Sequence, residues 1–349
     1  MKRVCVMMAL LAVLSLVSPL LGAPFYQVVD LGTLSGTQSV AYGINSQGEV
    51  CGYSYVTGSV SSHAFIWRSG TMTDLNPSGY AGSDAFGIND KGNVVGVTYL
   101  NQRQYAFLWK DGAATIIGDG YAEDININDE VVGYAGVLGT GQRHAFWYHN
   151  GIMTNLGAGN TAWAINDNRQ IVGASMDRYY NDQAVIWQNG QMTYLDTLGG
   201  PSGSATDINN YGEIIGHLYD PQGQCHSVLW RNDEIVDLGN LEGFRTYPKA
   251  INNQHQIVGF AVMPGGGAFL WQDGVLMCIN NLIQSSPGWT VSQAWDINDS
   301  GQIVGWGAYN GQFHAVLLNP VPEPSTILAL LCAISGLAWC RKTGLRFRS

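Results

Sequence analysis

The sequence has little charge for its length, and its acidic residues outnumber its basic ones. Charged residues make up 12% of the 349 residues, and the formal net charge is −10. Six of the 16 basic residues lie in the two terminal segments, which leaves 10 basic and 25 acidic residues between them, a net charge of about −15. Such a charge disfavours contact with a phosphate backbone, so we expect no nucleic-acid partner.

Cysteine is also scarce and follows no pattern. Only Cys51, Cys225 and Cys278 lie between the terminal segments, without CxxC spacing, which indicates neither a disulfide framework nor a zinc site, although one irregular disulfide stays open. GxSxG, HExxH and P-loop motifs are absent, and the acidic residues are scattered over turns. We therefore expect a protein that is not an enzyme and binds neither a cofactor nor a metal.

Glycine and aromatic residues are plentiful, and they occur within seven copies of one unit. Each copy begins with an Ile-Asn pair and has a glycine eight residues after the isoleucine. The pairs are Ile44-Asn45, Ile88-Asn89, Ile125-Asn126, Ile165-Asn166, Ile208-Asn209, Ile251-Asn252 and Ile297-Asn298. Successive isoleucines are 37 to 46 residues apart, close to the length of a four-stranded propeller blade.

The second copy illustrates the strands that each unit predicts. Its alternating and β-branched stretches are residues 85–89, 93–99, 105–109 and 113–117, separated by turns such as Asp90-Lys91-Gly92 and Asp111-Gly112. Four short strands joined in this way form one antiparallel sheet. Its apolar faces can be covered only by neighbouring copies, so the copies must stack.

The two ends of the repeat region predict a closed ring. The seventh copy stops after its third strand, at residues 314–318, whereas the region opens with residues 25–31. Val29-Asp30-Leu31 matches the fourth-strand residues Thr73-Asp74-Leu75. We therefore predict an all-β, seven-bladed β-propeller of four-stranded antiparallel blades, closed by the N-terminal strand, which completes the last blade. An open β-solenoid is the alternative.

The third strand of most copies contains a short motif of the type His63-Ala64-Phe65. In combination with the Ile-Asn units it resembles the HAF family of extracellular repeats, over residues 25–319. Tyr105, Gln183 and Gly267 replace the histidine in three copies. The resemblance implies an extracellular protein.

The N-terminal segment has the layout of a secretory signal peptide. Lys2 and Arg3 precede an apolar stretch at residues 4–17, and small residues follow at Gly22 and Ala23. We expect signal peptidase to remove residues 1–22, which leaves 23–320 as the seven-repeat propeller.

The C-terminal segment, residues 321–349, resembles a PEP-CTERM sorting signal. Its motif Pro322-Glu323-Pro324 precedes an apolar run at residues 327–340 and the basic pair Arg341-Lys342. The resemblance implies recognition by an exosortase, removal of the tail and delivery to the cell envelope or extracellular matrix of a Gram-negative bacterium. Until then the apolar run anchors the chain in the membrane, although it is shorter than the roughly 20 residues that span a bilayer. A plain C-terminal anchor is the alternative.

The repeated residues favour structural roles. Each Ile-Asn asparagine precedes a turn that its side chain can cap, although seven such amides on one ring could also line a binding channel. The glycine eight residues after each isoleucine indicates bending or close sheet packing in the second strand. Equivalent histidines lie in different blades, too far apart to share a metal. They are His63, His144, His226 and His314.

The loops after the second and fourth strands vary in length and composition, and both classes emerge on the same face of an antiparallel blade. Variable loops on a rigid scaffold are typical binding sites. The candidate ligand-binding residues are the aromatic residues Tyr80, Tyr121, Trp163, Tyr179, Tyr180, Tyr219, Phe244, Tyr247 and Trp289. They predict an exported, non-catalytic binding or matrix protein that contacts polysaccharide or another surface protein. A glycan hydrolase or lyase and a purely structural spacer remain as alternatives.

Overall fold

The computed structural model describes residues 24–321, except for Val60, residues 137–142, Tyr180, Ser285 and Pro287. The predicted signal peptide, the sorting residues Pro322, Glu323, Pro324, Arg341 and Lys342, and the candidate Tyr180 therefore lie outside the described residues. Within the described part, no helix is long and apolar enough to cross a membrane. Cys51, Cys225 and Cys278 are free thiols.

The described residues form seven four-stranded antiparallel sheets, and each sheet is one blade. Blade 1 consists of β2 (Ser39–Ile44), β3 (Val50–Tyr55), β4 (Ser62–Arg68) and β5 (Thr71–Asp74). Blade 2 consists of β6 (Gly82–Ile88), β7 (Val94–Leu100), β8 (Arg103–Lys110) and β9 (Ala113–Asp119). Blade 3 consists of β10 (Tyr121–Ile125), β11 (Val131–Gly136), β12 (Arg143–His149) and β13 (Ile152–Ala158). Blade 4 consists of β14 (Asn160–Ile165), β15 (Ile171–Met176), β16 (Asp182–Gln188) and β17 (Gln191–Tyr194).

The remaining three blades follow the same order, except that the last one uses both ends of the repeat region. Blade 5 consists of β18 (Gly203–Ile208), β19 (Ile214–Tyr219), β20 (Cys225–Arg231) and β21 (Glu234–Asp237). Blade 6 consists of β22 (Thr246–Ile251), β23 (Ile257–Ala261), β24 (Ala268–Gln272) and β25 (Val275–Cys278), followed by the 3-10 helix η1 (Ile279–Asn281). Blade 7 consists of β26 (Trp289–Ile297), β27 (Ile303–Tyr309), β28 (Gln312–Val321) and β1 (Phe25–Asp30).

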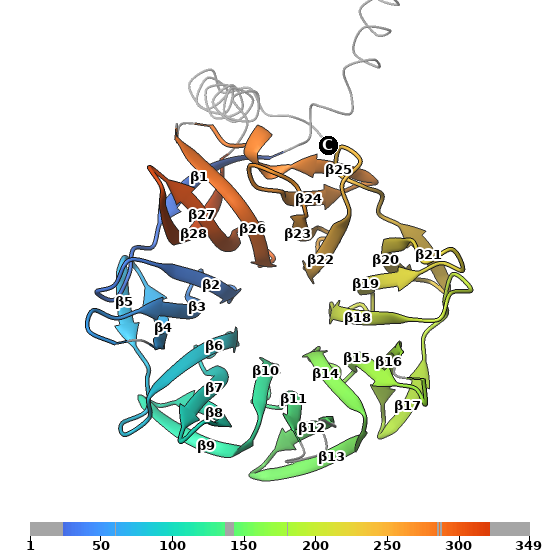
Figure 1. Ribbon diagram of the computed structural model, residues 1–349, viewed down its shortest axis with the longest axis horizontal. Coiled ribbons are helices and arrows are strands. Elements are labelled where there is room, and N and C mark those ends of the chain that lie inside the picture. Colours follow the sequence, from blue (N-terminus) through green and yellow to red (C-terminus); the bar gives the residue numbers. More distant parts are fainter. Residues whose placement is uncertain are drawn as a thin grey trace, which may run out of the picture. The chain divides into compact units, whose positions relative to one another are not determined.

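The blades surround a central axis, with β2, β6, β10, β14, β18, β22 and β26 innermost (Figure 1). They belong to a compact unit of Val28–Asn281 and Pro287–Asn319. A second unit includes the described residues 24–27, Leu282–Ser286 without Ser285, and 320–321. Within this second unit the Tyr26 amide donates to the Leu282 carbonyl at 2.9 Å, and the Gln284 amide donates to the Tyr26 carbonyl at 3.0 Å.

The predicted closure is confirmed, because β1 is the outer strand of the sheet that contains β26, β27 and β28. The Leu31 amide donates to the Ala315 carbonyl at 3.0 Å. The same bond joins the fourth and third strands of blade 1, from the Leu75 amide to the Ala64 carbonyl at 2.8 Å. The N-terminal strand therefore occupies the position that β5 occupies in blade 1.

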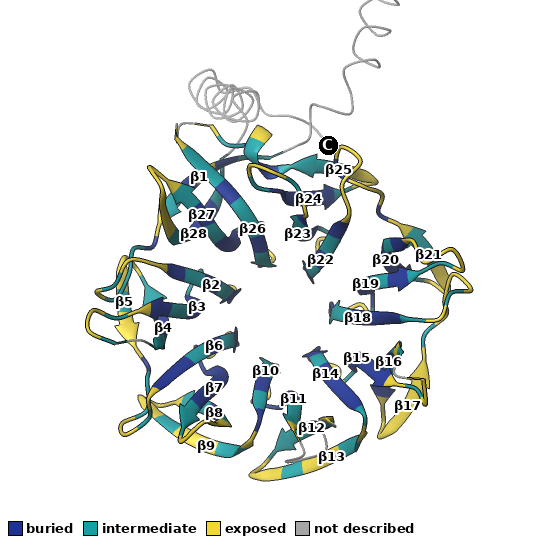
Figure 2. Ribbon diagram, in the orientation of Figure 1, coloured by how far each residue is buried: buried dark blue, intermediate teal, exposed yellow. Residues whose placement is uncertain are grey.

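The hydrophobic core lies between neighbouring blades. One cluster joins Leu31, Ala41 and Phe65 to Val304 and Leu317, so it connects blade 1 to blade 7 across the closure. Buried residues concentrate on the inner strands and exposed ones on the outermost strands (Figure 2). Alternation of apolar and polar residues on short strands explains this pattern, because each blade hides both faces of its inner strands against its neighbours.

Every innermost strand has a β-bulge two residues before its Ile-Asn isoleucine. In blade 1, for example, Ala41 pairs with Gly52 and Gly43 pairs with Cys51, so Tyr42 has no partner. The same irregularity recurs in the other six blades. A bulge redirects the unpaired side chain and is common beside functional sites.

The repeated glycine lies opposite this bulge in every blade, which confirms the interpretation of close packing. A Cβ atom there would lie 1.9 to 2.1 Å from a backbone carbonyl oxygen of the innermost strand, a distance that no side chain tolerates. The glycines are Gly52, Gly96, Gly133, Gly173, Gly216, Gly259 and Gly305.

Two faces of the ring follow from this topology. We call the face with the turns between first and second strands the turn face. The opposite face, with the loops after the second and fourth strands, is the variable face. Asn45 lies on the turn face and Gln38 lies toward the variable face, at opposite ends of β2.

Candidate functional site

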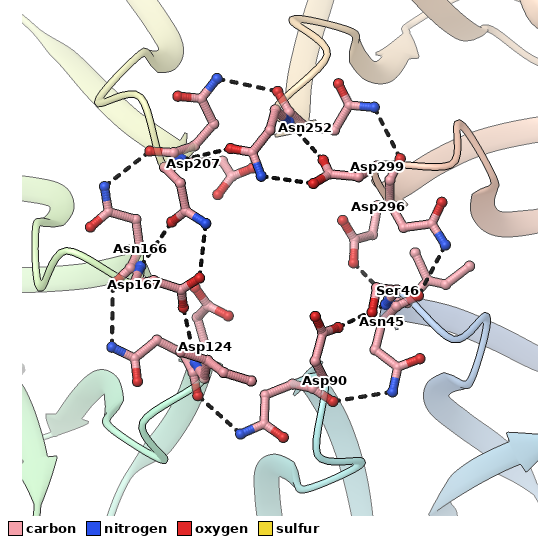
Figure 3. Close-up of a pocket in the computed structure, with 18 of the residues that line it drawn as sticks. Asn45, Ser46, Asp90, Asp124, Asn166, Asp167, Asp207, Asn252, Asp296 and Asp299 are labelled. Carbon is pink, nitrogen blue, oxygen red and sulfur yellow. Dashed lines mark hydrogen bonds between the residues drawn. The ribbon is translucent and has the colours of Figure 1, made fainter.

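The seven Ile-Asn asparagines form a closed circle of hydrogen bonds on the turn face. Each side-chain Nδ2 donates to the backbone carbonyl of the equivalent asparagine in the next blade, at 2.9 to 3.2 Å. The last bond, from Asn298 to Asn45, closes the circle. Figure 3 shows part of this circle around the central opening.

The same asparagines also hold their own turns. In blade 1 the Oδ1 atom of Asn45 accepts from the amides of Gln47 and Glu49, and Nδ2 donates to the Glu49 carboxylate at 2.8 Å. Equivalent pairs of backbone bonds occur in the other blades. The amide therefore has no hydrogen-bonding capacity left for a ligand. Its role is structural, as turn capping predicts.

Three aspartates bridge neighbouring blades just inside this circle. Asp124 accepts from the Ile165 amide at 2.8 Å, Asp207 from the Ile251 amide at 2.7 Å, and Asp296 from the Ile44 amide at 2.8 Å. In each receiving blade the equivalent residue is small: Ala164, Ala250 or Gly43. The carboxylates thus join blades 3 to 4, 5 to 6 and 7 to 1.

The turn-face opening is a polar cavity of about 230 Å³, lined by the three aspartates and the asparagine circle (Figure 3). Burial raises the pKa of Asp124 to about 6 and that of Asp296 to about 7, and it raises the pKa of Asp207 well above its ordinary value. Nevertheless, no three His, Cys, Asp or Glu side chains of the described residues converge as metal ligands.

The repeated histidine is also explained by packing within a blade. The Nδ1 atom of His63 lies 2.7 Å from the Asp74 carboxylate, and that of His226 lies 2.8 Å from Asp237. In blade 3, His144 instead lies 3.3 Å from the Asn155 amide. Where tyrosine, glutamine or glycine replaces the histidine, the partner position also changes, to Ile116, Tyr194 and Cys278. The histidine therefore occurs in blades whose fourth strand offers aspartate or asparagine at the partner position.

The seven unpaired bulge residues form the most diverse set in the repeat, and we call them the bulge ring. They lie on the innermost strands and are half-buried. Neighbours touch across blades: the Tyr42 ring centroid is 4.9 Å from that of Trp295 and 5.6 Å from that of Phe86. The members are Tyr42, Phe86, Glu123, Trp163, Thr206, Lys249 and Trp295.

An aromatic belt connects the bulge ring to the second strands toward the variable face. Successive ring centroids along it are 4.9 to 6.5 Å apart, and it passes through all seven blades. It is interrupted only between blades 4 and 5, where Thr206 occupies the bulge position. In order, the belt contains Trp163, Tyr134, Tyr121, Phe86, Tyr42, Trp295, Phe260, Tyr247, His217 and Tyr219.

A pocket of about 390 Å³ opens beside this belt at the junction of blades 7 and 1. Aromatic rings form most of its wall, contributed by Tyr42, Tyr53, Trp295, Trp306 and Phe313. The amide side chains of Gln38 and Gln293 also line it. Gln293 accepts from the Trp306 indole at 3.1 Å, whereas the exposed Gln38 side chain makes no hydrogen bond within the described structure.

Two charged members of the bulge ring have no hydrogen-bond partner among the described residues. Burial raises the pKa of Glu123 to about 7 and lowers the pKa of Lys249, while the two charges act on each other from blades 3 and 6. Burial, assisted by Lys249 and Arg245, lowers the pKa of His217 to about 4. Ionisable groups with perturbed pKa values are common at binding sites.

The structure brings four of the predicted ligand-binding residues together, since Tyr121, Trp163, Tyr219 and Tyr247 belong to the aromatic belt. The others lie apart from it. Tyr80 contacts Tyr105, Trp289 stacks on Tyr309, Tyr179 is 67% exposed beneath Arg178, and Phe244 is 37% exposed in a turn.

Sequence reasoning missed five members of the bulge ring: Tyr42 and Trp295, which line the pocket, and Phe86, Glu123 and Lys249 in other blades. Strand alternation alone does not show that a bulge interrupts the strand pairing at these residues. One signal was present, however. The residue two positions before the isoleucine of each Ile-Asn pair varies from copy to copy, and only tryptophan occurs there twice.

No family model and no curated protein matches this chain. Among solved structures, YCF48 bound to D1 peptide aligns with a TM-score of 0.55 and 12% identity, over 86% of this chain and 97% of that one. Pyrococcus horikoshii acylaminoacyl peptidase aligns with a TM-score of 0.51 and 12% identity, over 82% of this chain and 53% of its own. TolB from Acinetobacter baumannii aligns with a TM-score of 0.45 and 12% identity, over 71% and 63%.

The chain thus spans less than two thirds of the TolB and peptidase chains. At these identities the likeness concerns the fold alone. The chain is a seven-bladed β-propeller, and YCF48 aligns with it over most of both chains.

Proposed function

We propose that this protein is a non-catalytic binding protein that holds extracellular polysaccharide at the variable face. The observation that supports this most is the aromatic-walled pocket at the junction of blades 7 and 1, with Gln38 and Gln293 beside Tyr42 and Trp295. A sugar presents an apolar C–H face that packs on an aromatic ring, and hydroxyl groups that hydrogen-bond to amides. The pocket volume of about 390 Å³ is that of an ordinary small-ligand site.

The proposed setting is the cell envelope or extracellular matrix of a Gram-negative bacterium. It rests on the sequence at the two ends: a signal peptide for residues 1–22, and a sorting signal that includes Pro322, Glu323 and Pro324. The intact mass of protein recovered outside its native cells tests this. We expect both ends to be missing from the mature chain, and a species that still ends at Ser349 would contradict removal of the tail.

Binding and turnover measured together test the binding role. The full-length protein is applied to an array of oligosaccharides, and every oligosaccharide that binds is then incubated with the protein and analysed for cleavage. Binding without cleavage supports the proposal. Cleavage would instead favour the alternative of a propeller hydrolase or lyase, and absence of both would favour a structural spacer.

Two variants locate the site. Trp295→Ala removes one wall of the pocket and should weaken binding about tenfold, the equivalent of about 1.4 kcal/mol for one stacked ring. Tyr211→Ala is the control, because Tyr211 is 72% exposed in a turn on the turn face. Equal binding by the two variants would contradict a site at the pocket.

A further inference from the structure

The ten basic side chains of the propeller divide into two sets according to whether they form an ion pair within the described residues. Five lie on the turn face, and each forms an ion pair with Glu49, Asp129, Glu130 or Glu213. These are Arg68, Lys91, Lys110, Arg169 and Arg231. The other five have no ion pair with any described carboxylate: Arg103, Arg143, Arg178, Arg245 and Lys249. Four of them lie toward the variable face, and the fifth, Lys249, lies within β22.

Four of these five unpaired cations lie over aromatic rings. Arg143 is 5.1 Å from the Tyr134 centroid, Arg178 is 4.7 Å from Tyr179, and Arg245 is 5.9 Å from Tyr219. The Lys249 Nζ atom is 4.7 Å from the Trp295 centroid. A ring holds a cation in place without using up its N–H donors, so those donors stay available for an anion. Arg245 spends one of its donors on the Tyr247 hydroxyl at 3.1 Å and keeps the others.

Lys249 is the member of this set that lies beside the pocket, because its Nζ atom is 4.7 Å from the centroid of Trp295, which lines that pocket. It is half-buried in the bulge ring, its Nζ atom also lies 5.6 Å from the Phe260 centroid, and no described oxygen accepts a hydrogen bond from it. An ammonium group withdrawn from water without an acceptor is unfavourable. An anionic group of a ligand would remove this cost.

The geometry points to an acidic sugar as the ligand: we propose that the site binds a uronic acid unit of a polysaccharide, with its carboxylate at Lys249. This deepens the proposed function and rests on it. The apolar face of the sugar packs against Trp295 and Tyr42. Its hydroxyl groups donate to the Glu123 carboxylate, which has no other hydrogen-bond partner among the described residues, and Arg143 and Arg245 add positive charge around the site.

Matched pairs of oligosaccharides test the proposal, because a uronate oligomer differs from its neutral counterpart only in having a carboxylate in place of a hydroxymethyl group. We would measure binding of the full-length protein to oligomannuronate and mannan, oligogalacturonate and galactan, and oligoglucuronate and its neutral glucan, all of equal length. At least one uronate should bind ten times more tightly than its neutral partner. Acetate, tested as a competitor, should not displace it.

Lys249→Met keeps an apolar stem beside Trp295 and removes the charge, so it should fold at least as stably as wild type. It should weaken binding of the uronate at least tenfold, and it should weaken binding of the neutral counterpart by a clearly smaller factor. Lys110→Met, on the turn face, is the control and should change the binding of neither the uronate nor the neutral sugar. Lys249→Arg keeps the positive charge and should still bind the uronate more tightly than its neutral counterpart.

The outcomes separate this inference from the proposed function. If neutral oligosaccharides bind as tightly as uronates, or if Lys249→Met binds uronates like wild type, the acidic-sugar inference is overturned and the polysaccharide role stands. If none of the six oligosaccharides binds, both are overturned. Tighter binding of a pentapeptide through its terminal carboxylate would also overturn the inference, and would favour a protein partner.

Discussion

The Nδ1 atom of His314 lies 3.0 Å from both carboxylate oxygens of Asp30, although 284 residues separate them in the chain. Within blades 1 and 5 the corresponding pairs, His63 with Asp74 and His226 with Asp237, are 11 residues apart. The chain therefore joins its two ends with the same side-chain contact that it uses inside single blades.

Removal of the closing strand should destabilise the whole propeller. A variant that begins at Thr33 lacks β1, which exposes an edge of β28 and removes Leu31 from the core cluster between blades 7 and 1. We expect a loss of several kcal/mol, a large part of a typical stability of roughly 5 to 15 kcal/mol. Thermal melting against a chain that begins at Ala23 measures this, and equal midpoints would contradict the role of β1.

Loss of the histidine contact alone should cost little. His314→Ala and His63→Ala each break one half-exposed pair, so each should cost less than about 1 kcal/mol. A much larger loss for His314→Ala than for His63→Ala would mean that this single contact, rather than the strand and its core residues, holds the ring closed. Chemical denaturation of both variants gives the comparison.

Gly133→Ala should be strongly destabilising. The added Cβ atom would lie 1.9 Å from the Tyr121 carbonyl, so the bulge that holds Glu123 must move. We expect a cost of about 3 kcal/mol or more. Gly136→Ala is a matched control in the same strand, since a Cβ there meets nothing within 4 Å. A similar effect of the two substitutions on urea unfolding would refute the steric explanation.

Asn126→Asp tests the asparagine circle with almost no change of shape. The substitution replaces the Nδ2 donor, which bonds the buried Glu130 carboxylate at 2.8 Å and the Asn166 carbonyl at 3.2 Å, with an acceptor. Repulsion from Glu130 should lower stability by roughly 3 kcal/mol at pH 7. Asn128→Asp, exposed in the same turn, should cost less than about 0.5 kcal/mol. Comparable melting midpoints for Asn126→Asp and Asn128→Asp would contradict the structural role assigned to the asparagine circle.

Stability should fall as pH rises, because of the aspartates around the turn-face cavity. Burial raises the pKa of Asp296 to about 7, above its ordinary value of 3.8. A carboxyl with a higher pKa in the folded chain stabilises the fold fully below about pH 4 and loses that contribution as pH rises through about 7. His217 acts in the opposite sense, since its pKa is lowered to about 4 and its contribution is lost as pH falls below 6.5.

Asp296→Asn isolates the carboxyl from these other groups, because the asparagine stays neutral and can still accept from the Ile44 amide. Between pH 5 and pH 8 wild type should lose on the order of 2 kcal/mol relative to this variant, allowing about 1.4 kcal/mol per pKa unit and some screening by water in the cavity. Urea unfolding at both values measures the difference. Asp111→Asn, in an exposed turn, should follow wild type throughout.

Much of the fold could be predicted because each blade repeats the same local rules. The predicted strands at residues 85–89 and 113–117 correspond to β6 and β9, which extend a few residues further. The closure was predictable because residues 29–31 repeat a fourth-strand sequence. Turn capping likewise predicted the role of the asparagines, although the bond of each one to the next blade depends on the curvature of the ring.

The residues of the bulge ring could not be predicted in this way, because a comparison of the repeats identifies only what the blades share. Glu123 and Lys249 each occur once at the bulge position, and their relation depends on blades 3 and 6 lying around one axis. Loop aromatics such as Tyr179 are easy to notice in the sequence. In the structure, however, Tyr179 is 67% exposed, whereas the residues of the aromatic belt lie on strands.

The bridging aspartates alternate with small residues around the ring. Asp124, Asp207 and Asp296 occupy every second blade, each followed by a blade with alanine or glycine at that position. Three is the largest number of carboxylates that seven blades accept without placing two side by side. Because seven is odd, the alternation must fail once, and Gly43 is followed by Gly87. At that joint the carboxylate comes from the turn instead, because Asp90 of blade 2 accepts from the Ser46 amide of blade 1 at 2.8 Å. The pair of blades at which the alternation fails is therefore still bridged by a carboxylate.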